Sequence, residues 1–196
     1  KTGADDYDII YGESTYLVSD HVSTGVSGDD NSLSYPLPFD FPFYGKSYNK
    51  VWVNSNGTIN FDGSYNGYSA DEATFKSKAM IAVLWKDLRT GSGGVGVSTN
   101  GTESITFFWN GATYYSGGAA ENASVTLYSD GTILCSYGDG NASGGFVGVS
   151  AGDGTHYRNL GLNGTSLANA DDIRFVPQDV PGGLTLAADG TLSGTA

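Results

Sequence analysis

The chain has 196 residues, which is enough for one ordinary domain with a buried core. Its 30 glycines follow no triplet repeat and 13% of its residues are aromatic, so the composition excludes a collagen-like or a disordered chain. The net charge of -12 argues against nucleic acid and anionic membranes as partners. The longest apolar run, Ala79–Trp85, is too short to span a membrane, so we expect no membrane insertion.

Short alternating or β-branched runs are separated by clusters of Gly, Asn, Asp and Ser, and this pattern predicts an all-β, antiparallel β-sandwich of roughly ten to twelve strands. The predicted strands are Thr15–Ser19, Ser32–Leu37, Lys50–Asn54, Thr58–Asp62, Ala79–Leu84, Val95–Ser98, Ser104–Trp109, Ser124–Ser129, Thr132–Tyr137, Phe146–Ala151 and Asp172–Val176. One short helix is predicted at Ala70–Ser77. Trp52 and Trp85 fall in apolar strand runs, so we expect both to be buried on facing sheets.

Two hairpin turns are indicated by dipeptides that tolerate a positive φ, Asn56-Gly57 and Asp130-Gly131. A two-residue loop at Asp130-Gly131 sets Leu127 opposite Leu134, so both faces of this hairpin are partly apolar. We therefore expect a central hairpin, with Cys135 as a core residue.

The sequence pattern changes near Pro177, where a second and smaller hairpin with its own Asp189-Gly190 turn begins. This tail is too short to fold alone. We therefore predict a β-sandwich domain over residues 1–177, and a terminal hairpin or domain fragment over residues 178–196.

Six sequence blocks, taken in order, resemble the nidogen-like extracellular domain of large bacterial and archaeal surface proteins. They are Pro38–Gly45, Val51–Thr58, Ala79–Leu88, Ile105–Asn110, Val125–Tyr137 and Val147–Val149. The tail, with Pro181-Gly-Gly-Leu184 followed by Asp189-Gly-Thr-Leu-Ser-Gly-Thr195, resembles the start of an immunoglobulin-like repeat. The resemblance implies a β-sandwich in a modular protein located outside the cell or on its surface. Lys86 departs from the family pattern, which more often has an acid before Asp87.

The sequence contains no recognisable catalytic signature. Its two histidines, His21 and His156, lie in polar, loop-like segments, and neither belongs to a metalloprotease motif; a nucleophile elbow and a P-loop are also missing. We therefore expect no enzyme but a structural or adhesion module, with a glycan or a protein ligand on another surface as its partner.

One loop has the start of a calcium-binding pattern. Asp62, Ser64 and Asn66 place oxygen atoms at alternate positions before a glycine, and Asp71 and Glu72 follow at positions ten and eleven. A typical calcium loop closes with a bidentate acid at position twelve, and the same residue types are also the ordinary residues of turns. Calcium is the cofactor that this loop predicts.

Four tyrosines in loop-like stretches give an alternative function, a lectin-like carbohydrate-binding module. Tyr65, Tyr68, Tyr114 and Tyr115 can stack flat rings on sugar faces while neighbouring Asn and Asp side chains bond the hydroxyl groups. The ordinary alternative is that tyrosines occupy sheet surfaces because they fit the pleat.

A further alternative is the subunit of an extracellular fibre, in which copies of the chain are each other's partners. The acidic segment Asp5–Tyr11 and the tail hairpin are both extensions that can add a strand to the sheet edge of a neighbour.

Overall fold

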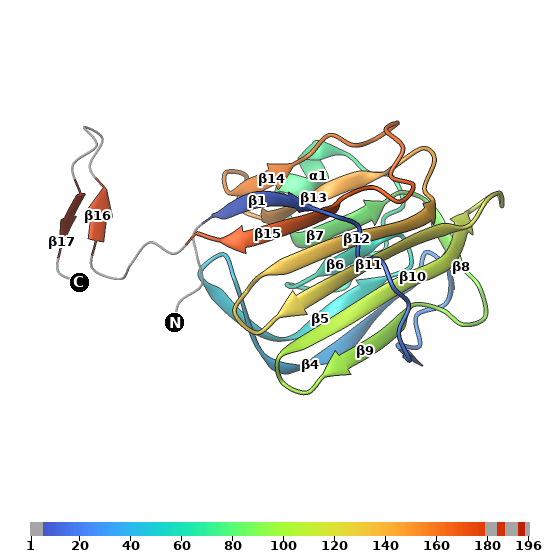
Figure 1. The fold of residues 1–196 in the computed structure, drawn as a ribbon, viewed down its shortest axis with the longest axis horizontal. Coiled ribbons are helices and arrows are strands. Elements are labelled where there is room, and N and C mark those ends of the chain that lie inside the picture. Colours follow the sequence, from blue (N-terminus) through green and yellow to red (C-terminus); the bar gives the residue numbers. More distant parts are fainter. Residues whose placement is uncertain (1–5, 179–183, 187–191, 195–196) are drawn as a thin grey trace.

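The computed structural model describes residues 6–178, 184–186 and 192–194. The chain forms two antiparallel sheets of nine and six strands that pack face to face (Figure 1), which confirms the predicted all-β sandwich. The strands outnumber those expected, because several two- or three-residue strands bridge neighbours without leaving a signal in the sequence.

The nine-stranded sheet has the order β1-β15-β12-β11-β10-β8-β3, and β9 pairs with both β10 and β2. Its strands are β1 (Tyr7–Gly12), β2 (Val22–Ser23), β3 (Gly28–Asp29), β8 (Leu88–Thr90), β9 (Gly96–Asn100), β10 (Ser104–Tyr114), β11 (Glu121–Tyr128), β12 (Ile133–Gly140) and β15 (Asp172–Pro177).

The six-stranded sheet has the order β14-β13-β7-β6-β5-β4. Its strands are β4 (Ser32–Phe43), β5 (Lys46–Asn54), β6 (Thr58–Asn60), β7 (Ala79–Trp85), β13 (Phe146–Ala151) and β14 (Tyr157–Asn159). The helix α1 (Glu72–Lys76) lies within the predicted segment, between β6 and β7 in the chain.

The main core lies between the two sheets, and strand alternation decides which side chains enter it. Val51 and Val53 of β5 are fully buried in this core, so Trp52 between them points to the opposite face of the sheet. Trp52 is half-buried there, with the Lys50 ammonium 5.0 Å from its ring centroid. The prediction that Trp52 lies in the core is therefore wrong. Val51, Trp52 and Val53 are all apolar, so the sequence does not show which of them face the core and which face outward.

A second, smaller apolar cluster covers the outer face of the six-stranded sheet. Its buried members are Phe75, Met80, Ala82, Trp85 and Phe146. Trp85 is fully buried, as predicted, but it lies in the same sheet as Trp52 rather than on a facing one.

The β11–β12 hairpin closes with three loop residues instead of two. Tyr128 N–H donates to Thr132 O at 2.9 Å, Gly131 adopts a φ of 93°, and Leu127 pairs with Ile133 rather than with Leu134. The Asp130 carboxylate accepts from Thr132 N at 2.8 Å, and this bond favours the longer loop. The predicted register was therefore wrong by one residue, while Cys135 lies in the core as expected.

Two further expectations change at the chain's ends. Thr15–Ser19 is irregular rather than a strand, and Thr15 N–H donates to the Asp172 carboxylate at 3.1 Å. Strand β1 (Tyr7–Gly12) contains most of the segment Asp5–Tyr11, which was predicted as an extension for a neighbouring copy, and it pairs with β15 of the same chain. In the tail, β16 (Leu184–Leu186) pairs with β17 (Leu192–Gly194), and the predicted Asp189-Gly190 turn lies outside the described residues.

Candidate functional site

The segment Asp62–Asp71, which we call the covering loop, crosses the outer face of the six-stranded sheet. The Trp85 indole N–H donates to Gly67 O at 2.9 Å, and the Asn54 side-chain amide donates to Tyr65 O. Asn56 Nδ2 donates to Asn66 O at 3.4 Å. Because Trp85, Asn54 and Asn56 are themselves fully buried, these bonds fix the loop backbone against the sheet.

A hollow of about 290 Å³, which we call the tyrosine hollow, opens where the end of the covering loop meets the end of β10 and the connection from β7 to β8. Its lining residues are Tyr68, Ser69, Ala70, Trp85, Lys86, Asp87, Tyr114 and Asn163. Tyr68 and Tyr114 are 54% and 43% exposed, which is unusual for large aromatic side chains and leaves both rings open to a ligand.

The structure brings together three of the four tyrosines that the sequence singled out. Tyr68 and Tyr114 line the tyrosine hollow, and Tyr115 packs on Tyr114 with 5.0 Å between ring centroids. Tyr65 lies apart from them, because it lines a different hollow and its ring meets Trp85 edge-on at 5.9 Å.

A partly buried ion pair stands beside the tyrosine hollow. Lys86 Nζ lies 2.8 Å from Glu121 Oε1, and both side chains are nearly nine-tenths buried. Lys86 also donates to Ser143 Oγ at 3.3 Å. The lysine that departs from the nidogen-like pattern therefore has its charge matched by an acid from β11, which the sequence order alone could not reveal.

A group of carboxylates lies next to the same hollow. Among the described residues, Asp29, Asp30 and Asp87 form one group whose oxygen atoms lie within 4.8 Å of one another. The pKa of Asp87 is raised, first by desolvation and then by repulsion from Asp29 and Asp30. Asp29 pairs with Arg89 across the β3–β8 ladder, so these aspartates, distant in sequence, meet through strand pairing. Three carboxylates can offer up to six oxygens, which suits the coordination of calcium.

The five residues of the predicted calcium loop do not come together in this way. Asp62 accepts from the Tyr48 hydroxyl at 3.1 Å, and Asp71 caps α1 by accepting from Thr74 N at 2.8 Å. Glu72 pairs with Lys76 at 2.6 Å. Asn66 Nδ2 donates to Asp30 O at 3.0 Å, and Ser64 lines the hollow that also contains Tyr65. Each carboxylate of this loop thus has a partner of its own within the protein.

The described part of the chain holds no helix that is both long enough and apolar enough to cross a membrane. A comparison with curated proteins finds no match, and a comparison with solved structures finds none either.

A comparison with models of protein families matches residues 6–177 to the family described as NIDO related. This match confirms the nidogen-like resemblance of the six sequence blocks, while the immunoglobulin-like resemblance of the tail stays a prediction because the match ends at Pro177. NIDO-related domains are typically extracellular. Since the matched segment is well over half of the chain, the protein belongs to the NIDO-related family.

Proposed function

We propose that this domain is an adhesion module of an extracellular or cell-surface protein and that it binds carbohydrate in the tyrosine hollow. The observation that carries the proposal is the pair Tyr68 and Tyr114, two half-exposed rings from separate segments beside the polar groups of Asp87 and Asn163. Sugars present an apolar C–H face and a polar rim of hydroxyl groups, so they suit aromatic walls combined with a few hydrogen-bonding side chains.

The rigidity of the hollow supports the same function. Tyr114 lies in β10, opposite Leu88 of β8, and its ring packs against Tyr115. Tyr68 directly follows Gly67, the residue whose carbonyl is bonded to the buried Trp85. A site whose walls are fixed before binding loses little conformational entropy when the ligand arrives, which favours affinity from a small contact area.

The experiment is a glycan array followed by titration calorimetry with the glycan that binds best. We expect Tyr68→Ala and Tyr114→Ala each to weaken binding about tenfold, equivalent to about 1.4 kcal/mol for one aromatic contact. Tyr11→Ala is the matched control, because Tyr11 is 59% exposed but lies on the edge strand β1, which β15, β12 and β11 separate from β10. Equal losses in all three variants, or an array without any signal, would contradict the carbohydrate function.

A purely structural module is the second candidate, and it is consistent with membership of a family of extracellular domains. It predicts an array without signal and unchanged stability in the presence of any glycan. A fibre subunit is less favoured, since β1 already completes the sheet of its own chain.

A further inference from the structure

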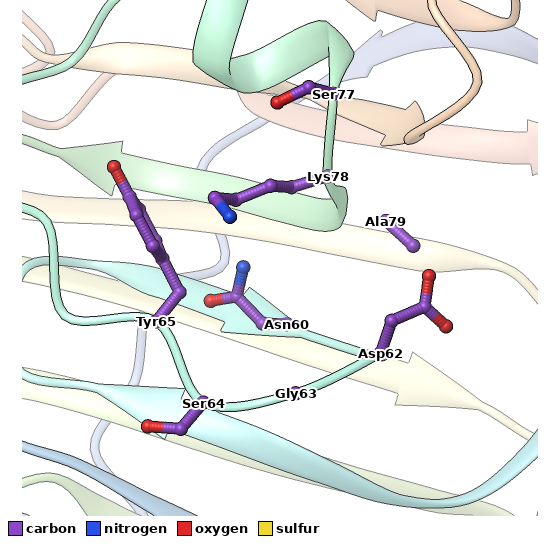
Figure 2. A pocket seen from close by; sticks show the side chains of 8 residues that line it. All are labelled: Asn60, Asp62, Gly63, Ser64, Tyr65, Ser77, Lys78 and Ala79. Atoms are coloured by element: carbon purple, nitrogen blue, oxygen red, sulfur yellow. The ribbon is translucent and has the colours of Figure 1, made fainter.

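A second hollow, of about 260 Å³, lies where the start of the covering loop faces the segment between α1 and β7; we call it the lysine hollow (Figure 2). Its lining residues are Asn60, Asp62, Gly63, Ser64, Tyr65, Ser77, Lys78 and Ala79. It shares no lining residue with the tyrosine hollow, so a ligand here would occupy a separate site.

Asn60 lines the lysine hollow, and within the described residues its side chain bonds only through its oxygen. The residue is only 2% exposed, and its Oδ1 accepts from the Thr58 hydroxyl at 3.1 Å. Among the described residues, Asn60 Nδ2 donates to no acceptor. Figure 2 shows this nitrogen turned toward the side chain of Lys78. Asn60 Nδ2 is not fully buried, so solvent reaches it in the hollow, and an acceptor supplied by a ligand would take the place of water at this donor.

Lys78 adds a positive charge at the same end of the hollow. Its ammonium lies 4.6 Å from the centroid of the Tyr65 ring, a cation–π contact that orients the side chain. Within the described residues, Lys78 has no carboxylate at ion-pair distance. The acid on the wall of the hollow, Asp62, lies beyond Asn60 in Figure 2 and accepts from the Tyr48 hydroxyl at 3.1 Å.

From this arrangement we propose that the lysine hollow binds the carboxylate of an acidic sugar, a uronate. The Lys78 ammonium and the Asn60 amide are two donors that face one point, and a carboxylate offers two acceptor oxygens with the charge that lysine requires. Asp62 and Ser64 also line the hollow, at separate positions in Figure 2. The Asp62 carboxylate can accept from a sugar hydroxyl group, and the Ser64 hydroxyl can donate to or accept from one. The volume admits a single sugar ring rather than a larger ligand.

The electrostatics of the two hollows differ, and this separates the inference from the proposed function. Beside the tyrosine hollow the charge of Lys86 is matched by Glu121, and Asp87 leaves that wall acidic. In the lysine hollow Lys78 has no carboxylate at ion-pair distance among the described residues, although Asp62 lines the same hollow. A uronate is therefore expected at the lysine hollow alone, whether or not the tyrosine hollow binds a glycan.

The test is a titration followed by ¹H–¹⁵N NMR, with the Asn60 side-chain amide as the reporting signal. The probes are sodium glucuronate and glucose, which share a ring and differ in the carboxylate, at constant ionic strength. We expect glucuronate to shift the Asn60 amide signals saturably, and glucose to bind at least about tenfold more weakly because it lacks the charge-assisted bonds. Equal shifts from both sugars, or no shift from either, would overturn the proposal.

Three lysine variants test which positive charge contributes to glucuronate binding. Lys78→Gln is expected to weaken glucuronate binding about tenfold, whereas Lys46→Gln, which removes an exposed charge from the start of β5, should leave it unchanged. Lys78→Arg should retain most of the affinity because it keeps the charge. If Lys78→Gln and Lys46→Gln weakened glucuronate binding equally, the effect would come from the net charge of the protein, and this would contradict a specific site at Lys78.

A third probe separates a sugar from a peptide as the source of the carboxylate. N-acetylaspartate carries carboxylates but no sugar hydroxyls, so it should bind more weakly than glucuronate if Asp62 and Ser64 contact the ring. Equal or tighter binding of N-acetylaspartate would overturn the assignment to a uronate. Tyr68→Ala should leave all three titrations unchanged, so the failure of one hollow to bind does not decide the other.

Discussion

The two faces of the six-stranded sheet are buried by different means. The inner face packs against a second sheet, and side chains such as Val53, Ile81 and Val83 have no exposed surface. The outer face is covered by the covering loop and α1, and the loop is held by hydrogen bonds from Asn54 and Asn56. Strand β7 contributes to both faces, which explains why its run from Ala79 to Trp85 is apolar at every position.

The inner and outer faces of this sheet therefore differ in role: the inner face stabilises the fold, whereas the outer face can bind a ligand. Sheet-on-sheet packing leaves no room for polar pockets, because neighbouring side chains interdigitate at high density. A loop fixed over an apolar cluster does leave room, and both hollows lie along the covering loop. The outer cluster is thus small in apolar area but holds the candidate ligand-binding surface in place.

The largest expected effect comes from emptying the outer cluster. Trp85→Ala removes a fully buried side chain and its bond to Gly67 O, so it should lower the free energy of unfolding by about 3–5 kcal/mol. Trp52→Ala on the same face removes a half-buried ring and should cost clearly less. Chemical denaturation measures both. Similar losses for the two variants would show that the outer cluster contributes little beyond surface packing.

The next effect tests the tight β5–β6 turn beneath the covering loop. Gly57 has a φ of 76°, and a Cβ there would lie 2.5 Å from Leu84 O. Gly57→Ala should therefore cost about 2–4 kcal/mol, from backbone strain and overpacking together. Gly101→Ala, at a φ of 56° with nothing within 4 Å, isolates the strain and should cost about 1–2 kcal/mol. Equal melting temperatures for the two variants would mean that Leu84 moves aside at little cost.

Calcium tests which acidic residues near the covering loop act as ligands. If calcium binds the folded state alone, it should raise stability by about 2.7 kcal/mol at one hundred times its dissociation constant. The measurement compares melting curves in millimolar calcium and in chelator for three proteins, namely the parent, Asp87→Asn, and the double variant Asp62→Asn with Glu72→Gln.

Loss of the calcium effect in Asp87→Asn would place the ion at the Asp29, Asp30 and Asp87 group, whose mutual repulsion a cation offsets. Loss in the double variant would instead support the loop that the sequence predicted. Identical parent curves with calcium and with chelator would contradict the calcium prediction at both positions.

The smallest effect concerns the cap of α1. Asp71→Ala should cost about 1 kcal/mol, because it removes the acceptor for Thr74 N. Hydrogen bonds from Thr74 lower the pKa of Asp71, so this stabilisation is present above the unfolded pKa of about 3.9 and is lost as the pH falls through the folded value. The difference between parent and variant, followed by denaturation across pH 2–7, should shrink at the acid end. Asp171→Ala, an exposed control, should show no such trend.

The sequence allowed the sandwich, most long strands and α1 to be predicted, because these depend on local patterns. Strand β1 and the short strands β3 and β8 were missed, since their pairing depends on contacts between distant segments. The segment Thr15–Ser19 has strand propensity, but among the described residues no ladder partner is available to it.

In the candidate sites, too, features that depend on local sequence could be predicted and features that depend on the fold could not. Exposed tyrosines in loops could be identified from the sequence, and Tyr68, Tyr114 and Tyr115 do lie together. Asn60 could not be identified from the sequence, because nothing in the sequence of a strand shows that the side-chain amide of one residue faces a hollow. The predicted calcium loop was chosen from the spacing of its acidic residues along the chain. In the structure, Asp71 instead caps α1 and Glu72 forms an ion pair with Lys76.

The pairing of β1 with β15 sets how the domain would respond to pulling. Tyr7 lies opposite Pro177, and Gln178 N–H donates to Asp6 O at 3.0 Å, so the chain enters and leaves at the same corner of the sheet. Tension applied through the two ends would load the ladder at that corner and open its hydrogen bonds one after another, as in unzipping, rather than shear them all at once. Under load this domain would yield first at β1, and the two hollows along the covering loop would keep their shape until β1 had peeled away.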